Sequence, residues 1–566
     1  MTVHRNLRAL ALACFIFGAA VCPATIEIAA QSRPSKSVNS RVGAKNVKPA
    51  VRGDVERFRQ RADAALSAAG PDKGSWGVLV SDASTGENLY ARNPAGYFMP
   101  ASNAKLFTTA FALATLGPDY RVRTTVSSNG TLDANGVLNG DIVLVGRGDA
   151  NLSSRKFPYD KREEKEGPPE KVIAELAAAV AARGVKEVSG DVVADDSMFQ
   201  HEKFPSGWLV DDILWSYGAA VSAIAVDDNT FTLDLRPGAR EGDPARYDAG
   251  LSSDFYTIEN TVVMSPRGSE EKLAVARDPG SRLIHVSGTM PLEAPVRRLT
   301  IAIEDPAEYA ASLLARLLQA RGVKVDGRSR ARHVPEPGAD PNAPQTIFAE
   351  HTSVPLSDEV RLTNKNSENL HAELLLLLAA HEKTGAKNYE DAAKAASDFF
   401  RAAGIADGDV VLSDGSGLSR KDLVTPRSVV QLLRYAATQP WGELYRSTLP
   451  VAGEDGTLLE RMKNSPAAMR VFAKTGTIGH GNALSGYATT VRGERLVFSI
   501  LGNNNNMHAQ DANKVIDSIC VAMIEELGPE KRKKHRHSCL CGFCVRRSFL
   551  EIKNGETRTG RSACAT

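Results

Sequence analysis

Cysteine is scarce in this chain of 566 residues, and its placement excludes most cysteine chemistry. None of the seven cysteines lies between Cys22 and Cys520, so this long middle part can hold neither a disulfide nor a thiol nucleophile. Cys520 lies in an apolar segment and is expected to be buried. The remaining cysteines near the end of the chain are Cys539, Cys541, Cys544 and Cys564. Three closely spaced thiols without a clear fourth ligand make a poor zinc site, so we favour an unstructured basic tail over residues 528–566, with a zinc module as the alternative.

The N-terminal region lacks an apolar run long enough for a typical membrane span. Its apolar stretch, residues 9–21, has about 13 residues, against the roughly 20 that a spanning helix needs. Arg5 and Arg8 precede the stretch, and small residues follow it before Gln31. This order predicts a secretory signal peptide over residues 1–30, with an uncleaved anchor as the alternative. The protein is therefore expected to be exported to the periplasm or cell envelope, with residues 31–53 as a flexible linker.

The body of the chain also lacks the positive charge that nucleic-acid binding requires. The net charge is +2, but residues 1–53 and 528–566 carry +7 each, which leaves −12 for the rest. An acidic body excludes nucleic acid as the expected partner, whereas the basic ends allow a loose association with a membrane surface.

Histidine is present without the spacing that is typical of metal sites. His201, His371 and His508 are therefore expected to be surface or helix-capping groups. His480 lies in a predicted turn, and we favour a structural role for it over a catalytic one. Residues 503–506 are four consecutive asparagines and are expected to form a turn.

The pattern of helices and strands predicts an α+β fold. Predicted helices at 172–183, 309–321 and 392–403 each end at a glycine (Gly184, Gly322 and Gly404) that precedes a short strand. Short strands are expected at 125–129, 137–145, 185–193, 230–235, 272–277 and 282–289. We interpret residues 126–349 as inserted material of one or two smaller α/β lobes, which interrupts a domain formed by 54–125 and 350–527.

The C-terminal part of that domain predicts an antiparallel sheet covered by helices. Helices are expected at 366–380, 426–438 and 512–527. Three strands at 469–474, 483–491 and 496–502 are joined by short turns and should lie side by side.

Ser102 and Lys105 are the strongest candidates for chemistry. Lys105 follows Ser102 by three residues, so both side chains share one face of a helix. Pro100 suits the first turn of that helix, and residues 106–116 give it an apolar face. A desolvated lysine can remove the hydroxyl proton, and the helix N-terminus favours a developing negative charge. The same pattern at Ser153 and Ser269 shows that the spacing needs companions.

Two further motifs contain residue types that suit a serine acyl-transfer site together with Ser102 and Lys105. Ser367-Glu368-Asn369 lies where a loop becomes a helix, so that a hydroxyl and an amide can point into a cleft. Lys474-Thr475-Gly476 lies on a predicted strand, where a substrate peptide can align and the glycine allows close approach. A second Lys-Thr-Gly, residues 383–385, follows a predicted helix and is better explained as its C-terminus.

In this order Ser102, Ser367 and Lys474 resemble the set of the penicillin-recognising serine D,D-peptidases and β-lactamases. Over residues 55–527 the chain resembles the D-alanyl-D-alanine carboxypeptidase/endopeptidase family, the class C low-molecular-mass penicillin-binding proteins. The stretches that carry this resemblance are 100–105 with 116–121, 190–196, 207–208 with 217–218, and 414–420. The insertion of about 260 residues before Ser367 is its most specific mark, because β-lactamases keep that interval short. The implied fold is a penicillin-binding, β-lactamase-like transpeptidase domain.

The resemblance implies a role for each motif residue. Ser102 attacks the carbonyl of the penultimate D-alanine, with Lys105 as the base. Ser367 passes a proton to the leaving amine, and Asn369 holds the substrate amide. Lys474 and Thr475 bind the terminal carboxylate, and the N–H groups of Ser102 and Thr477 form the oxyanion hole. Asp195 and Arg420 line the pocket for the side chain of the stem peptide.

The resemblance also implies partners and rivals for this function. The substrates are peptidoglycan stem peptides, β-lactam antibiotics are covalent inhibitors, and neither a metal nor an organic cofactor is needed. The rival interpretations are a serine β-lactamase, for which we identify no deacylating base, and a non-catalytic β-lactam-sensing or wall-binding protein. The intact Lys105 and Lys474 argue against the non-catalytic alternative.

Overall fold

The computed structural model describes residues 52–68, 74–337 and 345–529. The predicted signal peptide, almost all of the linker and almost all of the Cys-containing tail lie outside these residues. None of the helices in the described ranges has both the length and the apolar character needed to cross a membrane.

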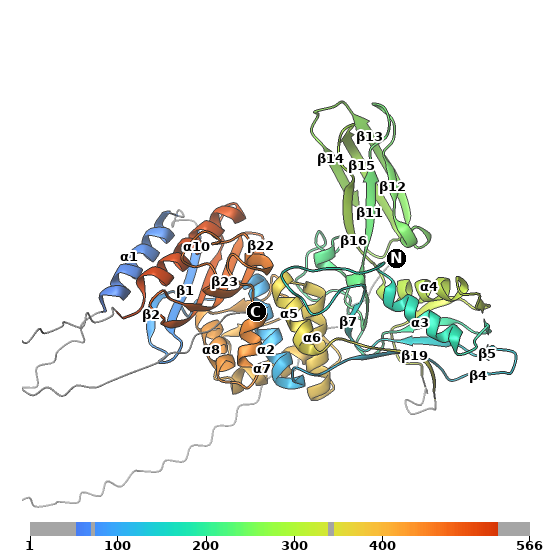
Figure 1. Ribbon diagram of the computed structural model, residues 1–566, viewed down its shortest axis with the longest axis horizontal. Coiled ribbons are helices and arrows are strands. Elements are labelled where there is room, and N and C mark those ends of the chain that lie inside the picture. Colours follow the sequence, from blue (N-terminus) through green and yellow to red (C-terminus); the bar gives the residue numbers. More distant parts are fainter. Residues whose placement is uncertain (1–51, 69–73, 338–344, 530–566) are drawn as a thin grey trace, which may run out of the picture. The chain divides into compact units, whose positions relative to one another are not determined.

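A five-stranded antiparallel sheet, ordered β2-β1-β24-β23-β22, has β22 at one edge (Figure 1). Lys474 lies on this edge strand. Its strands are β1 (Ser75–Asp82), β2 (Asn88–Arg92), β22 (Val471–Ile478), β23 (Gly481–Thr489) and β24 (Arg495–Asn503). The three C-terminal strands are adjacent, as their short turns predict. The sequence analysis missed β1 and β2, which complete the sheet because β1 pairs with β24.

Helices cover both faces of this sheet. Successive side chains of a strand point to opposite faces, so each face can pack against its own layer of helices. Val78 and Val80 of β1 face a core that also contains α1 (Gly53–Ala68) and α10 (Ala509–Glu526). Leu79 faces the opposite core, which contains α8 (Pro426–Ala437) (Figure 1). The sheet with its helices confirms the predicted α+β architecture.

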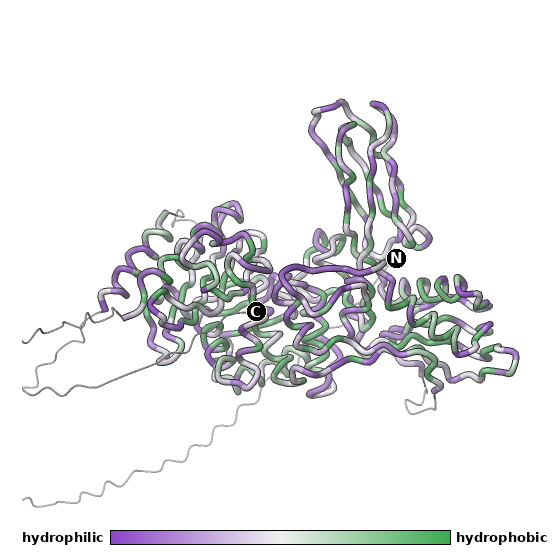
Figure 2. Tube along the Cα trace, in the orientation of Figure 1, coloured by the Kyte–Doolittle hydropathy of each residue, from purple (hydrophilic) through white to green (hydrophobic). Residues whose placement is uncertain are grey.

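A group of helices next to the sheet carries the serine motifs. It contains α2 (Ala104–Leu116), α5 (Leu356–Asn366), α6 (Asn369–Thr384), α7 (Tyr389–Ala402) and α9 (Gly442–Thr448), together with the short pair β20 (Val410–Val411) and β21 (Leu423–Val424). Helices α2 and α6 are apolar on almost every face, which is typical of buried helices (Figure 2). Gly385 ends α6 with a φ of 77°, so the second Lys-Thr-Gly is a helix terminus as predicted.

The segment that we interpret as inserted begins and ends on two paired strands, β3 (Arg123–Ser128) and β19 (Thr346–Thr352). Its helices are α3 (Lys171–Ala182) and α4 (Pro306–Gln319). Its other strands are β4 (Thr131–Leu132), β5 (Val137–Asn139), β6 (Ile142–Val145), β7 (Asp149–Leu152), β8 (Glu187–Val188), β9 (Val192–Asp195), β10 (Ile224–Val226), β11 (Thr230–Arg236), β12 (Arg246–Asp248), β13 (Thr257–Ser265), β14 (Lys272–Ala276), β15 (Leu283–Pro291), β16 (Arg297–Ala302), β17 (Lys324–Val325) and β18 (Ser329–Arg332). One hydrophobic core draws all its buried residues from between Val126 and Ala349.

Two predicted strands of this segment are each two strands in different sheets. Residues 137–145 form β5 and β6, and residues 185–193 form β8 and β9. Strands β5 and β8 belong to the sheet β17-β8-β5-β4, whereas β6 and β9 belong to the sheet β18-β9-β6-β3-β19. The breaks occur where Gly140, with a φ of 147°, accepts a hydrogen bond of 3.2 Å from the N–H of Gly190. Such a φ lies far from the φ of a β-strand, so the strand stops there. Glycine adopts this φ because it has no side chain.

Candidate active site

Ser102 lies in a short 3₁₀ turn, Ala101–Asn103, directly before α2. Asn103 donates a hydrogen bond of 3.0 Å from Nδ2 to the carbonyl oxygen of Lys474, which ties the turn to β22. Asn503 accepts a hydrogen bond of 2.6 Å from the N–H of Met99 and donates one of 3.2 Å to the carbonyl oxygen of Met99. Asn503 therefore ends β24 and holds the chain before Ser102; the prediction that it begins a turn is wrong.

Lys105 is fully buried and contacts the Ser102 hydroxyl. Its Nζ donates to Ser102 Oγ at 2.9 Å and to the carbonyl oxygen of Ser416 at 2.8 Å. Burial lowers the pKa of Lys105 to about 8, although Asp414 and Glu373 oppose the shift. A substantial share of neutral amine therefore exists near neutral pH, and this form can accept the hydroxyl proton.

Ser367 and Asn369 face the two lysines from the junction of α5 and α6. Ser367 ends α5 with a φ of 68° and accepts a hydrogen bond of 2.8 Å from Lys474 Nζ. Asn369 accepts a hydrogen bond of 2.6 Å from Lys105 Nζ through Oδ1. Its Nδ2 donates a hydrogen bond of 2.7 Å to the carbonyl oxygen of Tyr217. Burial, and then the charge of Lys105, lower the pKa of Lys474 well below its usual value. The two amines and two hydroxyls thus form two pairs, Lys105 with Ser102 and Lys474 with Ser367.

Two buried carboxylates hold the loop that contacts Lys105. Glu373 of α6 accepts the N–H groups of Gly415 and Ser416, both at 2.8 Å. Asp414 accepts the N–H of Gly417 at 2.7 Å, which completes the turn. Burial, and then the charge of Asp414, raise the pKa of Glu373 to about 8. The sequence analysis missed Glu373, although a carboxylate in the middle of an apolar helix is a signal of a buried polar contact.

Replacing Gly417 with alanine is expected to displace the nucleophile turn. Gly417 has a φ of 83°, and a Cβ there would lie 1.9 Å from the carbonyl oxygen of Ala101. The backbone before Ser102 must therefore move, and a displacement of the reacting group by about 1 Å costs roughly 100-fold in rate. Acylation by a fluorescent penicillin in Gly417→Ala, followed by stopped-flow, measures this loss.

Gly408→Ala is the matched control for that substitution. Gly408 has a φ of 84°, but the nearest atom to its added Cβ is the Tyr97 hydroxyl at 3.6 Å. Both variants carry the same backbone strain, so only Gly417→Ala should slow acylation. Equal rates in the two variants would contradict the proposed contact.

An open cleft of about 660 Å³ lies above Ser102. Predicted site residues in its lining are Ser102, Ser367, Asn369, Arg420 and Thr477, and further residues in it are Asp212, Tyr217, Asn482, His480 and His508. The ring of His480 lies 3.0 Å from the carbonyl oxygen of Asn505 through Nδ1. Lys105 and Lys474 are buried directly behind this lining.

Three other predicted site residues take positions that the sequence did not specify. A Cβ at Gly476 would lie 2.8 Å from the carbonyl oxygen of Pro100, so this glycine lets β22 approach the nucleophile turn. The Thr475 hydroxyl donates a hydrogen bond of 2.8 Å to Thr457. Asp195 forms an ion pair with Arg332 at 3.2 Å and is absent from the cleft lining. The acidic residue from the segment 126–349 that lines the cleft is Asp212, not Asp195.

Comparison with known proteins identifies the family. A sequence model of the D-Ala-D-Ala carboxypeptidase 3 (S13) family matches residues 60–524. The chain belongs to this family. It is 36% identical over 486 residues to the D-alanyl-D-alanine carboxypeptidase of Actinomadura sp. (strain R39), a match that covers 84% of this chain and 86% of that relative.

A further relative, matched both by its sequence and by its crystal structure, comes from Haemophilus influenzae. Its D-alanyl-D-alanine carboxypeptidase DacB is 26% identical over 438 residues, which cover 76% of this chain and 85% of that protein. The crystal structure of its penicillin-binding protein 4 matches with a TM-score of 0.70 at 24% identity, over 81% of this chain and 97% of the other. The predicted penicillin-binding, β-lactamase-like fold is confirmed.

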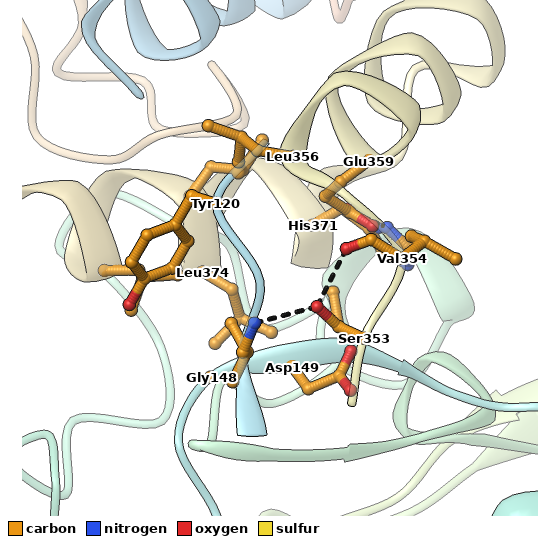
Figure 3. Close-up of a pocket in the computed structure, with 13 residues that line it drawn as sticks. Tyr120, Gly148, Asp149, Ser353, Val354, Leu356, Glu359, His371 and Leu374 are labelled. Atoms are coloured by element: carbon orange, nitrogen blue, oxygen red, sulfur yellow. Dashed lines mark hydrogen bonds and ion pairs between the residues drawn. The ribbon is translucent and has the colours of Figure 1, made fainter. Parts of the chain in front are cut away.

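A small cavity of about 20 Å³ lies between β7 and α6 in this S13 carboxypeptidase (Figure 3). Its lining includes Tyr120, Ser353 and Leu374, and the buried carboxyl group of Asp149. Burial raises the pKa of Asp149 to about 7, and its Oδ2 lies 3.5 Å from His351 Nε2. The volume admits about one water molecule, so this cavity is too small for a peptide substrate.

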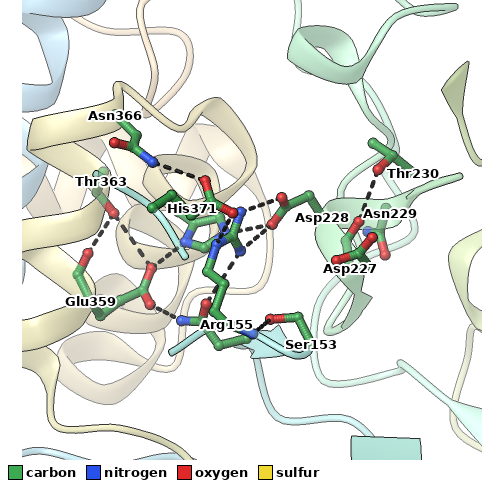
Figure 4. A network of polar contacts seen from close by, with 12 residues as sticks. Ser153, Arg155, Asp227, Asp228, Asn229, Thr230, Glu359, Thr363, Asn366 and His371 are labelled. Atoms are coloured by element: carbon green, nitrogen blue, oxygen red, sulfur yellow. Dashed lines mark hydrogen bonds and ion pairs between the residues drawn. The ribbon is translucent and has the colours of Figure 1, made fainter. Parts of the chain in front are cut away.

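Beside this cavity, buried charges join β7 and its neighbours to α5 and α6 (Figure 4). His371 lies 2.8 Å from Asp228 through Nε2 and 2.6 Å from Glu359 through Nδ1. Arg155 pairs with Asp228 and, at 2.9 Å, with Glu163, which accepts a hydrogen bond from Asn366 next to Ser367. The prediction that His371 is a surface or capping group is wrong, since its side chain is fully buried between two carboxylates.

Replacing His371 with leucine is expected to lower the free energy of unfolding by about 3–5 kcal/mol, because two buried carboxylates lose their shared cation. The two carboxylates raise the pKa of His371 from 6.5 to about 10, although burial opposes them. The folded state therefore holds this proton more tightly. The stabilisation is fully present below about pH 6.5 and is lost as pH rises to about 10.

Urea unfolding of the wild type and His371→Leu between pH 6 and pH 10 measures this effect. The difference between the two proteins should shrink as pH rises. His381→Leu on the same helix is the control, since the ring of His381 contacts the backbone oxygen of Ala386 at 3.0 Å and packs edge-on against Phe199, where His371 contacts two carboxylates. A difference that stays constant over this pH range would exclude the proposed role of the His371 proton.

Proposed function

We propose that this protein is an exported serine D-Ala-D-Ala carboxypeptidase that trims peptidoglycan stem peptides through an acyl-enzyme on Ser102. The observation that carries the proposal is the contact of 2.9 Å between Ser102 Oγ and the fully buried amine of Lys105. A serine hydroxyl needs a base, and a buried amine with a lowered pKa supplies one.

The acylation step follows from the positions of these groups. Lys105 takes the proton of Ser102 as Oγ forms a bond to the carbonyl carbon of the penultimate D-alanine. The backbone N–H groups of Ser102 and Thr477 stabilise the oxyanion, a contribution of about 10²–10³ in rate for each donor. The C–N bond then breaks as Ser367 gives its proton to the leaving amine, and Ser367 regains a proton from the ammonium of Lys105. The Lys474 amine, 2.8 Å from Ser367, supports this transfer. Water hydrolyses the ester and restores Ser102.

Substrate binding rests on polar groups around the cleft. The terminal carboxylate of the stem peptide binds beside Lys474 and Thr475, and its charge restores the proton that burial disfavours on Lys474. Asn369 orients the substrate amide, and Arg420 binds an anionic group on the side chain of the stem peptide. Cross-links between stem peptides present the same kind of bond, so endopeptidase action belongs to the proposal.

Covalent inhibition by β-lactams follows from the same acylation. A structure of the Haemophilus influenzae penicillin-binding protein 4 contains a β-lactam. A β-lactam ring presents a strained amide to Ser102 and a carboxylate to Lys474, as the peptide does. The apolar stretch at residues 9–21, with Arg5 and Arg8 before it, supports export to the cell envelope.

Product analysis with the purified protein tests this function. We expect release of D-alanine from a stem pentapeptide, cleavage of a cross-linked dimer, and a penicillin adduct that persists for many turnovers of peptide. Rapid hydrolysis of penicillin without release of D-alanine would instead identify a β-lactamase.

A further inference from the structure

Asp196 and His333 lie side by side at the ends of two parallel strands, away from the cleft lining. In the pair β9 and β18, Arg332 lies opposite Asp195, so the next residues on both strands are Asp196 and His333. The Nδ1 atom of His333 lies 2.9 Å from Asp196 Oδ1.

His201 adds a third potential ligand to this pair. One side-chain N or O atom from each of Asp196, His201 and His333 can be chosen so that all three lie within 4.8 Å of one another. The ring of His201 lies against that of His333, with centroids 3.7 Å apart. His201 is exposed, as predicted, but Asp196 and His333 lie too irregularly along the chain for the sequence to predict that they are its neighbours.

Outer contacts hold two of the three ligands in a fixed orientation. The Nε2 atom of His333 lies 3.1 Å from Asp305 Oδ2, while Asp305 Oδ1 caps α4 by accepting the N–H of Glu308 at 2.9 Å. Asp196 accepts a hydrogen bond of 2.8 Å from Ser222 through Oδ2, which leaves Oδ1 directed at His333. Around bound metals, a histidine commonly donates the N–H of one ring nitrogen to a carboxylate and coordinates the metal with the other nitrogen.

Space and charge also suit a cation. Asp196 is buried, His333 is half-buried and His201 is exposed, so the cluster is open to solvent on one side. A cavity of about 10 Å³ lies beside it, with Asp196, His201 and Ser222 in its lining. The nearby Lys203 is paired with Glu304 at 2.8 Å and does not neutralise Asp196 or Asp305.

We propose that Asp196, His201 and His333 bind one zinc ion, with water at the fourth position. Imidazole nitrogens and a carboxylate oxygen are ligands that zinc accepts, and three protein ligands leave one tetrahedral position open. On binding, the Nδ1 of His333 carries no hydrogen and donates its lone pair to the metal. Its Nε2 hydrogen stays on the hydrogen bond to Asp305.

The proposed zinc site also lies at the base of a segment that reaches the active cleft. Asp196 and Ser222 lie at the two ends of residues 197–221, and this segment contributes Asp212 and Tyr217 to the cleft lining. Tyr217 in turn accepts the hydrogen bond from Asn369. A bound zinc ion therefore fixes the base of the segment that forms one wall of the cleft.

Calorimetric titration of the EDTA-treated, dialysed full chain with zinc chloride tests the proposal. Thiols are potential zinc ligands, so the protein for this titration carries serine in place of Cys539, Cys541, Cys544 and Cys564. We expect one zinc ion per chain and a zinc-dependent rise in the melting temperature. Both should be lost in His333→Ala and in His201→Ala. Asp305→Asn keeps a good helix cap and should weaken zinc binding by about 10–100-fold.

His285→Ala is the control, because His285 is an exposed histidine that also contacts a carboxylate, Glu259 at 2.8 Å. It should bind zinc like its parent. Release of D-alanine by each variant verifies that it is folded. Absence of zinc binding to the parent protein, or unchanged binding in His333→Ala and His201→Ala, would overturn the proposal and leave His333 as a bridge between two carboxylates.

Discussion

Ser102→Ala is expected to reduce release of D-alanine from a stem pentapeptide by at least about 10⁵-fold, the order of loss when an enzyme loses its nucleophile. Alanine removes the only atom that forms the bond to substrate, while Lys105 keeps its contacts with Asn369 and Ser416. Binding of the peptide should change little, because the cleft and Lys474 remain. Single-turnover kinetics with a radiolabelled pentapeptide separate the chemical step from binding.

Ser269→Ala is the matched control for this experiment. Ser269 begins another Ser-x-x-Lys pattern, but its hydroxyl contacts Ser265 in an exposed turn far along the chain. Its activity should equal that of the wild type. Residual activity in Ser102→Ala within about tenfold of the wild type would show that another group carries the reaction.

Lys105→Arg is expected to reduce the acylation rate by about 10²–10⁴-fold, the contribution of a positioned general base. Arginine keeps the positive charge but does not lose its proton in proteins. A lysine that only supplies charge would tolerate this change far better than a lysine that accepts the Ser102 proton. Lys272→Arg, the lysine of the Ser269 pattern, is the control and should leave acylation unchanged.

The pH dependence gives a second measure of the same role. The pKa of Lys105 is about 8, and in the proposed mechanism the neutral amine is the active form. The value of kcat/KM should therefore rise with pH and level off above about pH 8 in the wild type. A profile without a rise near pH 8, together with a small effect of Lys105→Arg, would assign the base to another group.

Local pattern was enough to predict the main elements of the site. The position of Lys474 on a strand and of Lys383 at a helix end separated the two Lys-Thr-Gly motifs, and the structure agrees with both contexts. The helices predicted at 172–183, 309–321 and 392–403 end within two residues of the observed ends, because Gly184, Gly322 and Gly404 follow them with positive φ. Two strands were predicted as longer than they are, because the break at Gly140 depends on its contact with Gly190 in the folded chain.

The residues that were missed or misplaced depend on partners that are distant in sequence. His371 is buried because Asp228, 143 residues away, faces it, and no local pattern reveals that pairing. Asn503 holds Met99 across 404 residues. Asp195 was chosen for the cleft by resemblance, whereas the turn of the chain after β9 brings Asp212 there instead. Composition and periodicity describe elements, but they do not determine which side chains meet.

The mass of the intact protein after exposure to benzylpenicillin tests the acyl-enzyme most directly. We predict an increase equal to one penicillin molecule per chain, and peptide mapping should place the adduct on the peptide that contains Ser102. The Ser102→Ala protein should show no increase, whereas Ser269→Ala should label like the wild type. An adduct on another residue, or a protein that releases D-alanine without forming any adduct, would contradict catalysis through Ser102.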